Sequence, residues 1–161
     1  MIRNLALICL LFASCPSFAA APFCVRDSHG EMNFHFDALF DSAAQNPNLT
    51  QDFSPTVLQG IFLRMKNLAA RDSIFSQKLK DTWCQNAQNT VTVKDLFLTD
   101  SEKKSIHEDQ EQISMSIHLV ANLAGGAKPS ELSLHETQVI SHDAQGSTHL
   151  LSDNFELESF K

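Results

Sequence analysis

The chain has 161 residues, with 12 Lys and Arg against 19 Asp and Glu and a formal net charge of −7 at pH 7. Such an acidic chain lacks the cationic surface that contacts with nucleic acid or an anionic membrane require, so we expect neither as a partner. Its length suits one folded domain of ordinary size.

The first residues have the order that is typical of a secretory signal. Arg3 is followed by an unbroken apolar run over residues 5–13, and Ser17 and Ala19 are small residues where a signal peptidase requires them. The apolar run is shorter than the roughly 20 residues that cross a bilayer. No later segment is long and apolar enough to do so, and we expect no transmembrane segment.

We predict that residues 1–19 are a cleavable secretory signal and that residues 20–161 form a single domain. Cleavage after Ala20 is the close alternative. Loss of the signal lowers the count of basic residues from 12 to 11 against 19 acidic ones, which brings the net charge to about −8. The mature protein is therefore expected in the periplasm or the extracellular space.

Cys15 allows a second processing route. Phe12-Ala13-Ser14-Cys15 resembles the short sequence at which bacterial lipoproteins are cut and lipidated on the cysteine, although an aliphatic residue is usual in place of Phe12. Lipidation of Cys15 would anchor the protein to a membrane instead of leaving it soluble. This remains the alternative to cleavage after Ala19.

The cysteines support export. Of the four in the sequence, Cys9 and Cys15 leave with the signal, and Cys24 and Cys84 remain as a pair. An even pair in an oxidising compartment predicts a disulfide. Closing a loop of about 60 residues would stabilise the fold by up to about 4 kcal/mol in the chain-entropy model. The rival interpretation, a catalytic cysteine, has no local signature in this sequence.

The next segments predict short elements and then two clear helices. Residues 31–36 alternate as a strand, and residues 38–45 form a helix that ends at Asn46-Pro47. Ser54 and Pro55 then have the order of a helix start, and a second helix begins near Asp72 or Ser73. Their inner faces are predicted to carry Leu58, Ile61, Phe62, Met65, Leu68 and Ala69 in the first helix, and Phe75, Leu79, Thr82 and Trp83 in the second.

The middle of the chain is less regular. Residues 90–98 indicate a weak strand or a loop, and Thr99 and Glu102 form a capping box that predicts a polar helix over 102–110. Residues 113–124 fit a strand by their alternation and also fit a helical face that Gly125-Gly126 would end. We favour the strand because the alternation is nearly complete.

The last segment predicts an antiparallel hairpin. Residues 132–142 and 149–159 alternate with one apolar and one mostly polar face around a turn at Gln145-Gly146. The register that separates the two faces places His142 opposite His149.

The predicted register brings two possible metal ligands together. His142 and His149 would be close enough to share an ion, but two ligands are fewer than the three or four that zinc takes. The competing interpretation is a pair of ordinary polar residues at a hairpin tip. No serine elbow, zinc-protease helix or phosphate loop occurs in the sequence. We therefore expect no cofactor and assign no catalytic residue.

Together these patterns predict an α+β fold, with a helical N-terminal two-thirds packed on a C-terminal antiparallel hairpin or three-stranded meander. The function that fits best is an exported, non-enzymatic binding protein, such as a periplasmic accessory, inhibitor or toxin-neutralising protein. Its partner would be another protein, favoured by basic charge. The alternatives are a small exported enzyme with a site assembled from distant residues, and a small-ligand carrier.

Overall fold

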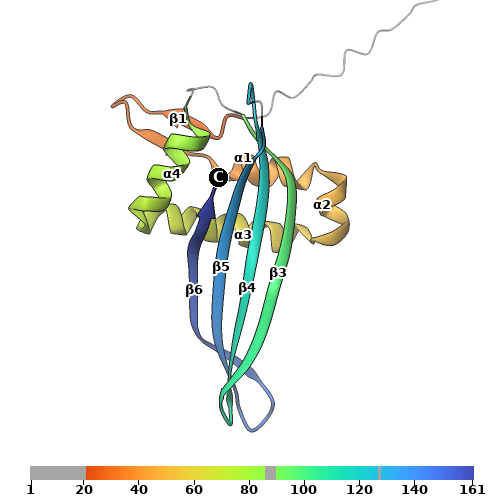
Figure 1. The fold of residues 1–161 in the computed structure, drawn as a ribbon. Helices are drawn as coiled ribbons and strands as arrows, with labels where there is room; N and C mark the ends of the chain where they lie inside the picture. The colour runs from red at the N-terminus through yellow and green to blue at the C-terminus, as the bar shows by residue number, and fades with distance from the viewer. Residues whose placement is uncertain (1–20, 86–89, 127) are drawn as a thin grey trace, which may run out of the picture.

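The computed structural model describes residues 21–85, 90–126 and 128–161. A two-stranded sheet is followed by four helices and then by four long antiparallel strands in the order β3-β4-β5-β6 (Figure 1). Of the described residues, 46% lie in strands and 32% in helices. The predicted fold class, with its helical N-terminal two-thirds and a sheet of two or three strands, is therefore wrong. The helices end at Trp83, and strands dominate the chain from Val91 onward.

The N-terminal sheet is a short hairpin. Strand β1 (Cys24–Arg26) pairs antiparallel with β2 (Met32–Phe34), and the Asp27 side chain accepts two backbone hydrogen bonds within the connecting turn. The strand predicted over residues 31–36 is longer than the observed one, because Phe36 already belongs to the next helix and is buried beneath it.

Helix α1 (Phe36–Ala44) begins two residues before its predicted start, and Asn46-Pro47 ends it as predicted. A further short helix, α2 (Pro47–Asp52), was not predicted. Asn46 caps α2 by accepting a hydrogen bond from the backbone of Asn48. Its amide group also donates to two carbonyl groups at the start of β3 and so ties the helices to that edge of the sheet.

The two longer helices confirm their predicted start signals. The Ser54 hydroxyl accepts a hydrogen bond from the Val57 backbone at the start of α3 (Pro55–Arg71), and Asp72 caps α4 (Ser73–Trp83) in the same way. The buried residues of both helices fall on the predicted stripes: Leu58, Ile61, Phe62, Met65 and Leu68 in α3, and Phe75, Leu79 and Trp83 in α4.

The main sheet is a meander of β3 (Val91–His107), β4 (Gln110–Leu123), β5 (Ser130–His142) and β6 (Thr148–Phe160). Each strand pairs with the next along the chain. The preference for a strand in the 113–124 segment is confirmed. The polar helix predicted over residues 102–110 is wrong, because this segment completes β3, turns and begins β4.

All the described register irregularities fall on the two edge strands. Val93 pairs with Ala121 and Asp95 pairs with Val120, so β3 contains one residue more than β4 at this point. Strand β3 has two more shifts of this kind. Strand β6 has two shifts, and the pairing of the inner strands β4 and β5 has none. Each shift leaves an extra residue on the edge strand, which is a β-bulge and increases the local twist.

One bulge changes the predicted hairpin register. His142 pairs with Thr148 and His149 with Ser141, so the predicted pairing of His142 with His149 is wrong by one residue at the tip. Beyond the irregularity between Val139 and Ile140, the predicted register holds from Val139 to Leu134. The extra residue on β6 restores the separation of the two faces.

Helices α1 and α3 lie against one face of the main sheet and cover its upper part in Figure 1. The side chain of Arg71 at the end of α3 donates to the carbonyl oxygen of Phe155 at 2.6 Å. A second anchor is aromatic, because the Trp83 ring contacts Phe23 from the N-terminal hairpin and Phe160 from β6. None of the described helices is long and apolar enough to cross a membrane.

Candidate binding groove

The strands extend well beyond the helices toward the turns that join β3 to β4 and β5 to β6 (Figure 1). Where the N-terminal half of α3 crosses the sheet, a groove of about 410 Å³ remains between the two layers. This volume lies in the range of about 300–1,000 Å³ that small-ligand sites occupy. We call it the α3 groove; its apolar lining comes from Val57 and Ile61 on the helix and from Leu98, Met115 and Ile117 on the sheet.

A buried carboxylate forms the polar part of the α3 groove. The Glu136 side chain is only 3% exposed, and its Oε1 accepts hydrogen bonds from Nη1 of Arg64 and from Nε2 of Gln138. Nη2 of Arg64 lies 3.6 Å from Oδ2 of Asp153 on β6. Two carboxylates therefore share one guanidinium at this point, and the local charge is negative.

The strand register explains why Glu136 is buried. It pairs with Met115 on β4 and with Phe155 on β6, and it shares the helix-covered face of β5 with Leu132 and Leu134. Successive side chains of a strand alternate between faces, so a charge at this position points toward α3. A buried charge is stable only with a partner, and Arg64 provides it.

The sequence analysis did not identify Arg64 or Glu136 as site residues. A signal for both is present. Glu136 interrupts the apolar face of its strand, and Arg64 lies three residues after Ile61 and four before Leu68, at the border of the apolar stripe of α3. A lone acid and a lone base on two facing apolar surfaces would have indicated this pair.

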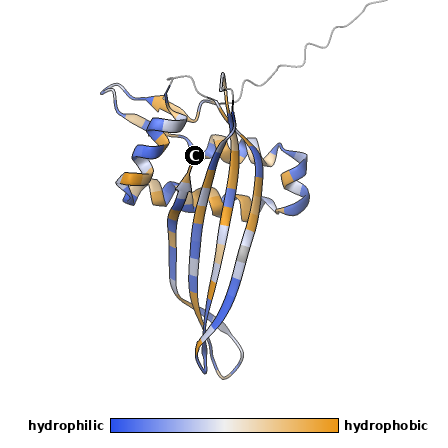
Figure 2. Ribbon diagram, in the orientation of Figure 1, coloured by the Kyte–Doolittle hydropathy of each residue, from blue (hydrophilic) through white to orange (hydrophobic). Residues whose placement is uncertain are grey.

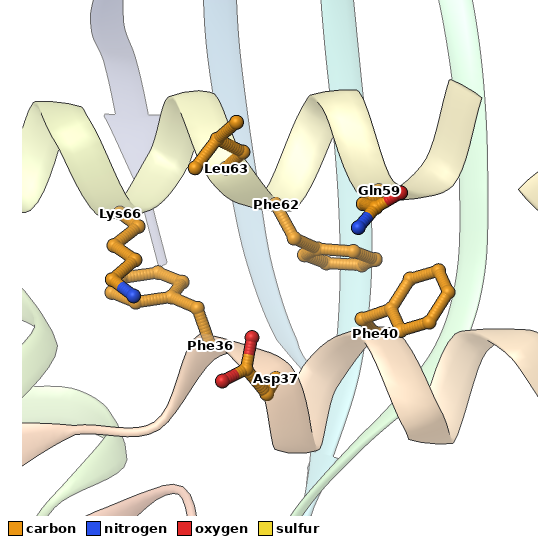
Figure 3. A pocket seen from close by; sticks show the side chains of 7 residues that line it. All are labelled: Phe36, Asp37, Phe40, Gln59, Phe62, Leu63 and Lys66. Atoms are coloured by element: carbon orange, nitrogen blue, oxygen red, sulfur yellow. The ribbon is translucent and has the colours of Figure 1, made fainter. Parts of the chain in front are cut away.

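A second pocket lies between α1 and α3. Figure 3 shows the side chains of both helices facing across it, with Asp37 and Phe40 on α1 and Gln59 and Phe62 on α3. Its volume is about 100 Å³, well below the range of ligand sites. We therefore take the α3 groove as the candidate binding site.

The two predicted metal ligands are separated in the structure. Nε2 of His142 lies 3.1 Å from Oε2 of Glu111, whereas Nε2 of His149 lies 3.2 Å from Oδ2 of Asp143. With the corrected register, neighbouring positions of the hairpin point to opposite faces, so His142 and His149 do not face each other. Across the described ranges of the chain, no group of three or more His, Cys, Asp or Glu side chains is placed to hold a metal ion.

These histidines instead contact carboxylates near the turns that join the strands. The pKa of Glu111 is lowered by a hydrogen bond from Lys103, whose Nζ lies 2.6 Å away, and also by His142. The pKa of Asp143 is lowered by the hydrogen bond from His149 and by the backbone of Ser147. Both carboxylates lie outside the α3 groove.

The face of the sheet that is turned away from the helices carries a histidine network. Nδ1 of His118 lies 2.8 Å from the Ser133 hydroxyl, and Nε2 lies 2.7 Å from the Thr99 hydroxyl. The His118 ring also stacks on Phe97. In serine hydrolases a carboxylate orients the imidazole, but here a hydroxyl occupies that position. The network therefore holds the strands together without forming a triad.

The predicted disulfide is present, with Cα atoms of Cys24 and Cys84 5.6 Å apart. It joins β1 to the end of α4 beside the buried Trp83. Both halves of the cystine are buried, at 0% and 5% exposure, which fits a structural role. Cys15 and the predicted signal over residues 1–19 lie outside the described residues.

Comparisons with known proteins give no relative: no family model, no curated protein and no solved structure matches this chain.

Proposed function

We propose that the protein is an exported, non-enzymatic binding protein that acts through contact with another protein. In a bacterium it would be a periplasmic accessory, inhibitor or toxin-neutralising protein. The buried Cys24–Cys84 disulfide supports an oxidising compartment. The acidic net charge of −7 favours a basic partner, because complementary charge speeds encounter and excludes wrong partners.

The observation that carries the proposal is the part of the main sheet that the helices leave uncovered. Two exposed apolar side chains lie on its helix-facing side: Leu98 on β3 is 46% exposed and Leu150 on β6 is 57% exposed. Val57 of α3, which lines the groove together with Leu98, is 45% exposed. Leu98 lies at the α3 groove, whereas Leu150 lies on the opposite edge strand, near the turn that joins β5 to β6. Exposed apolar side chains next to a groove are typical of a contact surface for a macromolecule.

Paired surface variants test this proposal. Leu98→Glu and Leu150→Glu alter the uncovered surface, whereas Ile74→Glu alters an exposed apolar residue at the start of α4. We expect a partner captured from the native compartment to be retained by wild type and Ile74→Glu and lost from the other two variants. A partner that all four proteins retain equally, or the absence of any partner, would contradict the proposal.

Export is tested separately by the intact mass of the protein expressed with its own N-terminal residues. We expect the mass of residues 20–161 with the two remaining thiols oxidised. A lipid adduct on Cys15 would replace the soluble form with the anchored alternative. A mass that retains residues 1–19 would contradict cleavage.

The volume of the α3 groove favours a second candidate, a small-ligand carrier. The two functions differ in what covers Leu150, because a small ligand inside the groove would leave this residue exposed. A carrier would therefore bind its ligand equally well in wild type and in Leu150→Glu.

A further inference from the structure

The α3 groove contains the negatively charged Glu136, and the described residues use only part of the hydrogen-bonding capacity of its carboxylate. Both hydrogen bonds that Glu136 accepts within the described ranges end on its Oε1, so its Oε2 is left for another donor. The Glu136 side chain is 97% shielded from solvent, given its 3% exposure, and it lines the groove. A carboxylate oxygen in such a shielded side chain gains from a charged donor that reaches it through the groove.

The positive charge of Arg64 does not neutralise the negative charge of this site. Its guanidinium contacts Glu136 and also lies near Asp153, so a single positive charge faces two negative ones. An incoming anion would meet excess negative charge, whereas an incoming cation would restore neutrality. The charge of the groove therefore selects a cation.

The walls of the groove define the rest of the ligand. Leu98, Met115 and Ile117 on the sheet face Val57 and Ile61 on α3, so the path toward Glu136 is apolar. A Lys or Arg side chain has an apolar stem that packs on such surfaces and a charged head that donates hydrogen bonds.

We infer that the α3 groove receives a lysine or arginine side chain of the partner protein, with its head group at Oε2 of Glu136 and its stem between Val57 and Leu98. This inference rests on the proposed function and identifies the chemistry that the partner must present. Apolar residues that flank this cation in the partner would cover the exposed Leu98, and a part of the partner farther from the cation would cover Leu150.

Three amino-acid amides serve as probes: the Nα-acetyl N-methylamides of lysine, norleucine and glutamate. Each is titrated into the full, disulfide-bonded protein while NMR follows the Met115 methyl group and the Gly60 and Gln138 amides. We expect the lysine amide to bind in the groove and the norleucine amide, which lacks the charge, to bind about tenfold more weakly. The glutamate amide should not bind. Equal binding of lysine and norleucine amides, or stronger binding of the glutamate amide, would overturn the inference.

Two variants localise the probe. A Cβ at Gly60 would meet no atom within 4 Å, so Gly60→Leu places a side chain in the open groove and also replaces a glycine inside a helix. It should fold at least as stably as wild type and lose the lysine amide. Ala70→Leu, at an exposed position of the same helix, is its control. Retained binding in Gly60→Leu would place the cation elsewhere and refute the inference.

Glu136→Gln tests the charge itself and should weaken binding of the lysine amide about tenfold. Glu111→Gln removes an equal charge at the hairpin tip and should leave binding unchanged. If both variants weaken binding equally, the attraction comes from the net charge of the protein and the inference fails. If no probe binds while the partner still depends on Leu98 and Leu150, the inference fails and the proposed function stands.

Discussion

At the scale of single residues, the ion pair between Arg64 and Glu136 is a polar contact between the helical layer and the main sheet. Glu136 is buried, while Arg64 remains 36% exposed at the groove. The carboxylate therefore depends on Arg64 far more than the guanidinium, which water still reaches, depends on Glu136. Removing Arg64 alone should therefore cost stability, because it leaves the buried carboxylate without its partner.

We predict that Arg64→Met destabilises the protein by about 3 kcal/mol, at the lower end for breaking a buried pair, because the exposed guanidinium was already partly solvated. The double variant Arg64→Met/Glu136→Met should recover most of this loss, since no charge is then left buried. Lys78→Met, at an exposed position of α4, is the control for the loss of one positive charge. Urea unfolding measures all four proteins, and a double variant less stable than Arg64→Met would contradict the argument.

Glu111 gives a prediction for pH. Its folded pKa is lowered by the hydrogen bonds from Lys103 and His142, so the contact stabilises the fold above the ordinary pKa of 4.5 and is lost as pH falls through the lower folded value. Lys103→Met should raise the pKa of Glu111 toward 4.5. A carboxyl-carbon NMR titration measures it, and an unchanged pKa in the variant would remove Lys103 as the main cause.

At the scale of elements, the cap of α3 supports the groove, because the first turns of this helix carry Val57 and Ile61. The Ser54 hydroxyl is the side-chain acceptor at the helix start. We predict that Ser54→Ala costs about 1 kcal/mol in urea unfolding, and that Ser54→Asp keeps wild-type stability because it retains the acceptor and adds a favourable charge. Equal loss in both variants would show that the hydroxyl contributes in another way.

The helices and strands differ in how far they could be predicted from the sequence. Helices α3 and α4 were found because their caps and apolar stripes are local signals. Strand β3 was predicted only in part, as a weak strand or a loop over residues 90–98, because its bulges change the alternation. Val91 and Val93 share a face with Leu96 and Leu98, although one pair has odd and the other even numbers. The capping box at Thr99 then fitted a helix, while pairing with β4 held the segment as a strand. Long-range pairing of this kind is not visible in a local pattern.

The groove was not predictable in the same way. Arg64 and Glu136 are 72 positions apart in sequence, and only the packing of α3 on β5 brings them together. The disulfide was predictable despite its separation of 60 positions, because removal of the predicted signal would leave only one cysteine pair to form it.

At the scale of the whole molecule, the Cys24–Cys84 disulfide links the first strand to the end of the helical segment, which packs on the last strand through Trp83 and Phe160. We predict that Cys24→Ala/Cys84→Ala loses about 4 kcal/mol at most, since a loop of this length sets the upper limit. Urea unfolding of the variant, and of wild type with and without reductant, measures the loss. A variant as stable as oxidised wild type would show that the packing alone holds this end.

A meander with two outer strands presents backbone groups on which strands of neighbouring molecules could assemble into ribbons and fibrils. Here β3 and β6 carry all the irregularities of the described sheet, with an extra residue at each. Hydrophilic residues also dominate β6 and the part of β3 toward the turn (Figure 2). An incoming strand would lose its hydrogen-bond register within a few residues at either border. Both borders of the sheet therefore oppose the addition of a strand from a neighbouring molecule.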